Sequence, residues 1–160
     1  MAHRSRAREV ALQLLFQRDQ NSTPVPRAAV EQFARDRLLG DTEMTAYCLR
    51  LYDGTLTHQS EIDSTLASVA TNWRLSRMQP ADRSVLRMGI YELLFDPQYK
   101  PVETILNEAV DLARRFGSVE SPGFVNGVLD RIAKSRDAGE GTGPEVATPP
   151  VPPSETPTSQ

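Results

Sequence analysis

The chain has 160 residues, of which 39% are hydrophobic and 24% charged, and this length is sufficient for one domain with a substantial core. Its formal net charge of -3 divides unevenly, because residues 137–160 carry four acidic residues and no basic one, which leaves +1 for residues 1–136. A near-neutral body excludes the strongly basic type of domain that binds bulk nucleic acid without specificity.

Apolar residues recur at helical spacing in the first half of the chain and predict four helices there. In chain order these residues are Ala7, Val10, Ala11, Leu14 and Leu15; Ala29, Val30, Phe33 and Leu38; Met44, Tyr47, Cys48, Leu51 and Thr55; and Ile62, Leu66, Val69, Ala70 and Trp73. Residues 21–26 separate the first two helices, and Pro26 can open the second. Gly40 ends that helix, and Asp41 is a suitable cap for the third.

Two further helices are predicted after a break at residues 74–79. Pro80 opens the first of them, which is the most apolar so far and which we expect at the centre of the core. Pro97 and Pro101 bracket a short loop before the next helix, whose apolar positions run from Val102 to Phe116.

A glycine stop and a new cap introduce the last predicted helix. Gly117 most easily adopts a left-handed C-terminal turn, Ser121 suits the N-cap, and Pro122 suits the first helical position. No segment alternates strictly between apolar and polar residues with turn signals around it, so no sheet is expected. We predict an all-α protein of seven helices with short connections, in a compact helical bundle.

The last 24 residues have a different composition. Residues 137–160 contain no aromatic residue and are rich in glycine and proline, so they cannot bury enough apolar surface to offset the entropy of ordering. We therefore predict a folded domain over residues 1–136 and a disordered, acidic, Pro/Gly-rich tail over residues 137–160.

Motifs of catalysis are absent from the sequence. It has no glycine-rich phosphate loop, nucleophile elbow or paired histidine-carboxylate motif. Glu108 and Asp111 share a helix face, and with arginines nearby a solvated charged face is their simplest interpretation. The sequence thus predicts a binding protein and not an enzyme.

The remaining inventory predicts neither a metal nor a cofactor. The single Cys48 excludes an internal disulfide and is interpreted as a small core residue, and with only His3 and His58 beside it no metal cluster has ligand spacing. No segment approaches the roughly 20 apolar residues that cross a bilayer, and no signal peptide is recognisable. We expect a soluble, cytoplasmic protein with no membrane contact.

Two features point to an RNA ligand. Arg4, Arg6 and Arg8 stand at the start of a helix with only Glu9 nearby, where positive charge opposes the macrodipole unless an anion binds, and a phosphate backbone matches the arginine fork. Phe124, near the start of the last helix, is either an inward core aromatic or a platform on which a single-stranded base stacks.

Four segments, which span nearly all of the folded part, resemble the bacterial NusB family of transcription antitermination factors. They are RARE at residues 6–9 followed by Ala11, Leu14, Leu15 and Phe16; DRSVLRMGIYEL at residues 82–93; ILNEAVDLA at residues 105–113; and FVNGVLD at residues 124–130. The resemblance implies two small helical bundles packed across each other. It also implies binding to the single-stranded boxA element of nascent ribosomal RNA together with NusE, the small-subunit ribosomal protein, which tethers the RNA to elongating RNA polymerase and suppresses premature termination.

The resemblance also assigns site residues. It implies phosphate contacts at Arg4, Arg6 and Arg8, a base contact at Phe124, and a border of the same RNA surface at Arg83, Glu120 and Ser121. Phe16 and Asp82 fall at positions where the family meets NusE.

Two other interpretations remain open. The same helical domain occurs as an RNA-binding module fused to ribosomal RNA cytosine methyltransferases, although we expect no methyltransferase domain in a chain of this length. A helical self-association protein, in which Phe16, Phe124 and their apolar neighbours face a second copy, is the other, and a homodimer is compatible with RNA binding.

Overall fold

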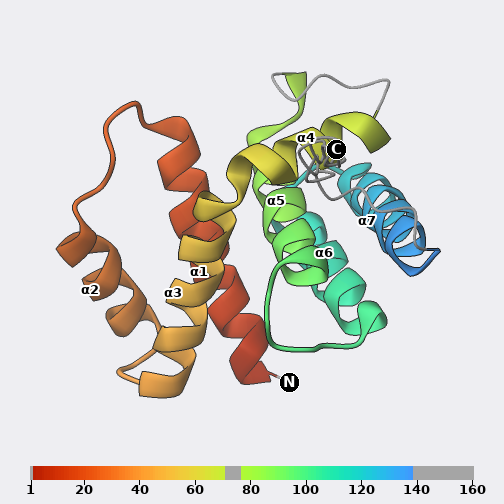
Figure 1. Ribbon diagram of the computed structural model, residues 1–160. Helices are drawn as coiled ribbons and strands as arrows, with labels where there is room; N and C mark the ends of the chain where they lie inside the picture. Colours follow the sequence, from red (N-terminus) through yellow and green to blue (C-terminus); the bar gives the residue numbers. More distant parts are fainter. Residues whose placement is uncertain (1, 71–76, 139–160) are drawn as a thin grey trace, which may run out of the picture.

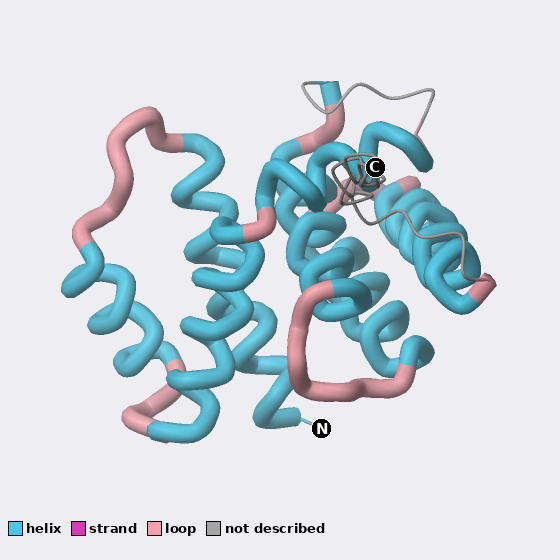
Figure 2. Tube along the Cα trace, viewed as in Figure 1, coloured by secondary structure: helices cyan, strands magenta, loops and turns pink. Residues whose placement is uncertain are grey.

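The computed structural model describes residues 2–70 and 77–138, which form helices joined by short turns (Figure 2). Within these residues there are seven helices and no strand, which confirms the predicted all-α class. The helices are α1 (Ala2–Gln20), α2 (Arg27–Arg37), α3 (Thr42–Thr57), α4 (Gln59–Val69), α5 (Pro80–Leu94), α6 (Val102–Phe116) and α7 (Ser121–Asp137). Trp73 and all but the first two residues of the predicted tail lie outside the described residues.

The helices form two small bundles that pack against each other (Figure 1). The first bundle contains α1, α2 and α3, and the second contains α4, α5, α6 and α7. Helix α5 contacts α1, α3, α4, α6 and α7, so the prediction that it lies at the centre of the core is confirmed. None of the helices in the described residues combines the length and the apolarity needed to span a membrane.

Most helix boundaries follow the predicted local signals. The Oδ1 atom of Asp41 accepts a hydrogen bond from the backbone N–H of Met44 at 3.0 Å, which caps α3. Gly40 has a φ of 73°, and this left-handed conformation ends the segment after α2. Pro80 is the first residue of α5, while α2 begins one residue after Pro26. Cys48 is fully buried, as predicted, and burial raises the pKa of its thiol to about 12.

The turn between α6 and α7 differs from the prediction. Gly117 has a φ of -100° and a ψ of -164°, so it is extended and not left-handed. Ser121 is the first residue of α7 and not its cap, and its Oγ atom accepts a hydrogen bond from the backbone N–H of Ser118 at 2.9 Å. A Cβ atom at position 117 would overlap the Ser121 side chain. Glycine is therefore required here for close approach, since any side chain would displace this serine.

A second close approach holds α3 against α5. A Cβ atom at Gly54 would overlap the ring of Tyr91, which is itself buried. We expect Gly54→Ala to lower the free energy of unfolding by about 1–3 kcal/mol, because the ring must move out of a packed core. Urea denaturation measures this change. In the matched control Gly127→Ala the new Cβ meets no atom within 4 Å, so equal stability of the two variants would contradict the expectation.

Candidate nucleic-acid interface

Arg8 lies inside the protein and not on its surface. It is 2% exposed, and it donates hydrogen bonds to both carboxylate oxygens of Glu92 at 2.7 and 3.0 Å. Its Nη1 atom also lies 3.7 Å from a Glu108 oxygen. Burial lowers the pKa of Arg8. The hydrogen bonds to Glu92 and the negative charge of Glu92 outweigh this effect, so the net pKa is raised. The predicted phosphate contact at Arg8 is therefore wrong, because this side chain ties α1 to α5.

A buried ionic cluster extends from this pair. Lys100 Nζ lies 2.6 Å from Glu92 Oε2 and 2.5 Å from Asp96 Oδ2, and it donates to the Tyr47 hydroxyl at 3.2 Å. Burial raises the pKa of Glu92, but Arg8 and Lys100 outweigh this effect and the net pKa is lowered. The cluster lies at the end of the molecule where α1 begins and where the loop between α5 and α6 passes (Figure 1).

The other two arginines of the N-terminal triad remain accessible. Arg6 has a side chain that is 43% exposed and forms an ion pair with Glu9 at 2.9 Å. Arg4 is half-buried, with its guanidinium carbon 5.7 Å from the centroid of the Tyr47 ring. The anions expected near the triad are thus partly the protein's own carboxylates.

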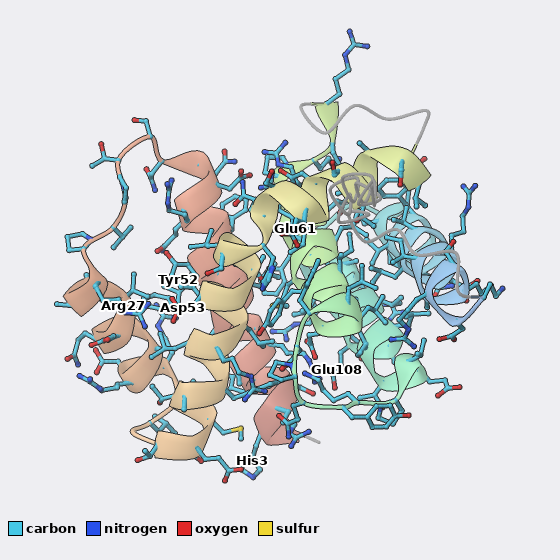
Figure 3. All side chains as sticks on the ribbon, viewed as in Figure 1. His3, Arg27, Tyr52, Asp53, Glu61 and Glu108 are labelled. Atoms are coloured by element: carbon cyan, nitrogen blue, oxygen red, sulfur yellow. The ribbon has the colours of Figure 1, made fainter. Side chains whose placement is uncertain are left out.

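Glu108 differs from its predicted place on a solvated charged face. It accepts a hydrogen bond from Ser5 Oγ at 2.6 Å, and Figure 3 shows it near the end of the molecule that carries His3. Its neighbour Asp111 does form an exposed pair with Arg114, at 2.8 Å. The two acids therefore have separate structural roles.

Arg115 is a candidate contact that the sequence interpretation missed. It donates two hydrogen bonds to Glu9, both at 3.0 Å, while 55% of its side chain remains exposed. Burial raises the pKa of Glu9, but Arg115 and Arg6 outweigh this effect and the net pKa is lowered. The guanidinium carbon of Arg115 also lies 5.2 Å from the Phe116 ring centroid. The pair thus connects the start of α1 to the end of α6.

Phe124 borders a small pocket at the start of α7. The pocket has a volume of about 120 Å³ and is lined by Arg77, Met78, Gln79, Asp82, Ser118, Glu120, Ser121 and Phe124. Phe124 is half-buried and packs partly against the core, so it shares features of both predicted alternatives. Glu120 is exposed, whereas Ser121 is 1% exposed and bonded to Ser118. The predicted role of Ser121 as an RNA border is therefore corrected to support of the turn.

The two residues expected to meet NusE face different pockets. Phe16 is 41% exposed and borders a pocket of about 380 Å³, together with Phe33 and Phe116. Asp82 is buried, its Oδ1 atom has no hydrogen-bond partner among the described residues, and it borders the Phe124 pocket instead. Ala81, the residue before Asp82 at the start of α5, borders the Phe16 pocket.

Arg83 is turned toward α1. Its guanidinium donates two hydrogen bonds to Asp19 Oδ2, at 3.1 and 2.6 Å, and Asp19 also accepts from Arg87 at 3.0 Å. Burial raises the pKa of Asp19, but both arginines outweigh this effect and the net pKa is lowered. The ion pair with Asp19 favours a structural role for Arg83, and its expected place at the border of the RNA surface stays a prediction.

The accessible candidates form an elongated surface. At one end Ser5 of α1 adjoins Glu108 of α6, and at the other end Phe124 follows the end of α6 at Phe116. These two points on α6 are about 12 Å apart at the usual rise of a helix. Arg115 lies between these two points on α6 and shares Glu9 with Arg6, so the accessible arginines follow the side of α6 that faces α1.

The fold and this surface define a class of all-helical, two-bundle protein with an elongated, arginine-bearing face. A model of the NusB family matches residues 5–134, and the chain belongs to the NusB family. It is 41% identical over 142 residues to the transcription antitermination protein NusB of Elusimicrobium minutum, covering 88% of this chain and 99% of the relative. It is 45% identical over 135 residues to the protein of the same name from Sorangium cellulosum, covering 84% and 94%.

Solved structures agree with the sequence relatives. Thermotoga maritima NusB has a TM-score of 0.70 and 33% identity, covering 86% of this chain and 96% of that chain. A complex of the antitermination factors NusB and NusE with double-stranded RNA contains a chain with a TM-score of 0.74 and 27% identity, covering 84% and 98%. The predicted family and fold are therefore confirmed.

Proposed function

We propose that this chain is a transcription antitermination factor of the cytoplasm, which binds the boxA element of nascent ribosomal RNA together with NusE. The pair tethers the RNA to the elongating RNA polymerase and suppresses premature termination. The observation that carries this proposal is membership of the NusB family over nearly the whole described chain. The function is one of binding, and no bond is made or broken.

The RNA contacts follow from the accessible part of the surface. Arg4, Arg6 and Arg115 bind phosphates, since each of these side chains is at least partly exposed. The half-buried ring of Phe124 stacks on an unpaired base, and Glu120 borders the same pocket. Arg8 and Ser121 hold the surrounding helices in place and do not contact the RNA.

NusE binds beside this surface. Phe16, Phe33 and Phe116 form an apolar wall of the Phe16 pocket. This wall accepts an apolar side chain of the partner. Asp82 lines the Phe124 pocket and its neighbour Ala81 lines the Phe16 pocket, so this part of α5 is placed near both ligands.

We place the end of the RNA-binding domain near the end of α7. The family match stops at residue 134 and α7 ends at Asp137, so we place the boundary of the RNA-binding domain at residue 136. The relatives named as antitermination proteins are themselves covered over 94 to 99% of their lengths, which supports this function over that of a module from a methyltransferase.

A gel-shift titration tests the proposal directly. We expect the chain to bind a boxA RNA more tightly than a scrambled RNA of the same length and composition, and we expect NusE to increase that preference. Mass measurement in solution at the same concentrations shows whether a homodimer forms. Equal affinity for the two RNAs in the presence of NusE would refute the proposed function.

A further inference from the structure

A second group of basic side chains surrounds the ring of Tyr47, where α1 meets α3. The guanidinium carbons of Arg4, Arg8 and Arg50 lie 5.7, 5.7 and 5.0 Å from the ring centroid, and Lys100 Nζ lies 5.0 Å from it. Each distance is within the range of a cation–π interaction. One buried aromatic ring therefore holds four cations close together.

The carboxylates at this site do not balance the cations. Glu92 accepts both hydrogen bonds of Arg8, and Asp96 accepts from Lys100 at 2.5 Å. With Glu108, which lies 3.7 Å from Arg8, three carboxylates pair with three of the four cations, and Arg4 is the fourth. The cluster therefore retains an excess of positive charge, which favours an external anion.

Arg4 and Arg50 are the members of the cluster that are least compensated and accessible. In residues 2–70 and 77–138 no carboxylate forms an ion pair with Arg4. Arg50 shares Asp96 with Lys100, because its Nε atom lies 3.3 Å from Asp96 and its Nη2 atom donates to Asp96 Oδ2 at 3.5 Å. The Nη2 atom also donates to the neutral side chain of Gln98 at 2.7 Å. The Arg50 side chain is also 37% exposed, so it is accessible to a ligand.

We propose that Arg4 and Arg50 together bind backbone phosphates of the RNA, so that the RNA path continues from α1 onto α3. The identity of the polyanion rests on the proposed function, whereas the site rests on the charges around Tyr47. Arg4 is two residues from the exposed Arg6, so the new contact is continuous with the phosphate-binding surface already described. Tyr47 is 4% exposed, so it orients the two guanidinium groups and stacks no base.

The salt dependence of RNA affinity tests this site. Arg50→Gln should lower the slope of log affinity against log salt by about 0.7, the value for one phosphate contact with a single strand. The affinity should fall roughly three- to tenfold at moderate salt. Because phosphates carry no sequence information, the loss should be equal on boxA and scrambled RNA. Arg50→Lys keeps the charge and should keep the slope.

Arg35→Gln is the matched control, because it removes the same charge from an exposed site on α2, where Arg35 pairs with Glu31. Equal slopes for the Arg50→Gln and Arg35→Gln proteins would overturn the site. Thermal denaturation accompanies each titration, since Arg50 also contacts the loop at Gln98. If Arg50→Gln lowers stability and a folded Arg50→Lys protein still loses the slope, the role of Arg50 is structural and the site is also overturned.

Two further results distinguish failure of this site from failure of the proposed function and from binding of a free anion. Failure of the proposed function appears as equal affinity of the wild type for both RNAs, and it leaves the slope change at Arg50 measurable. Inorganic phosphate is the second arm, added at constant ionic strength in a thermal-shift assay. A stabilisation by phosphate that Arg50→Gln abolishes, without any change in the RNA slope, would assign the site to a free anion and overturn the RNA contact.

Discussion

Replacing Glu92 with glutamine should lower the free energy of unfolding by about 3–5 kcal/mol, the usual cost of removing one partner from a buried ion pair. The carboxylate of Glu92 forms ion pairs with Arg8 and Lys100, and the side chains of all three residues are at most 3% exposed. With a neutral amide at position 92, the two buried cations lose part of the negative charge that balances them. Urea denaturation of the wild type and the variant measures the difference.

The control for this prediction is an ion pair of the same chemistry on the surface. Asp111 pairs with Arg114 at 2.8 Å, but both side chains are about two-thirds exposed, so Asp111→Asn should change stability by no more than about 0.5 kcal/mol. If Glu92→Gln were as mild as Asp111→Asn, the buried cluster would contribute nothing to stability.

The same cluster predicts the response to acid. The net pKa values of Glu92 and Asp96 are lowered, because their cationic partners outweigh burial. A carboxyl group with a lowered folded pKa stabilises the protein above its unfolded pKa, and this contribution is lost as the pH falls through the folded pKa. Stability should therefore decrease below about pH 4.5, the ordinary value for glutamate. Urea midpoints at pH 5, 4 and 3 should fall less steeply in Glu92→Gln than in the wild type.

Replacing Phe124 with alanine should weaken RNA binding by about 1–3 kcal/mol, which is the range measured for one stacked base. Phe124 is half-buried beside its pocket, so part of its ring is accessible to a base while the rest packs on the core. Binding to NusE should be unchanged, since the Phe16 pocket does not include Phe124. Titration with boxA RNA and with NusE separately measures both affinities.

Phe124→Leu distinguishes stacking from packing. Leucine retains most of the apolar contact with the core but has no ring, so its RNA affinity should be close to that of the alanine variant while its thermal midpoint remains near that of the wild type. A thermal midpoint that collapses in Phe124→Ala, together with normal RNA binding in Phe124→Leu, would show that Phe124 is only a core residue.

The helix boundaries could be predicted because their signals are local. Asp41 caps α3 by accepting a hydrogen bond from the backbone N–H of Met44, three residues later in the chain. Pro80 fixes the first turn of α5. Gly117 shows the limit of such signals. A glycine after a helix suggests a left-handed turn, but here the residue is extended and glycine is needed because Ser121 occupies the space of a side chain.

The candidate site was less predictable because its charges pair over long distances in the sequence. Arg8 and Glu92 are 84 residues apart, and Glu9 and Arg115 are 106 residues apart. Three arginines in a short segment look equivalent, yet helical geometry turns Arg8 into the core and leaves Arg6 outside. Arg50 has no distinguishing pattern in the sequence. It lies three residues after Tyr47 on α3, and the packing of α1 on α3 brings Arg4 and Arg8 to the same ring.

The ionic bond between Arg8 and Glu92 crosses from one bundle to the other. A polypeptide cut between α3 and α4 would place Arg8 in one fragment and Glu92, with Lys100, in the other, so the buried pair could form only when the fragments associate. We therefore expect the two bundles of the intact protein to unfold together in one cooperative transition.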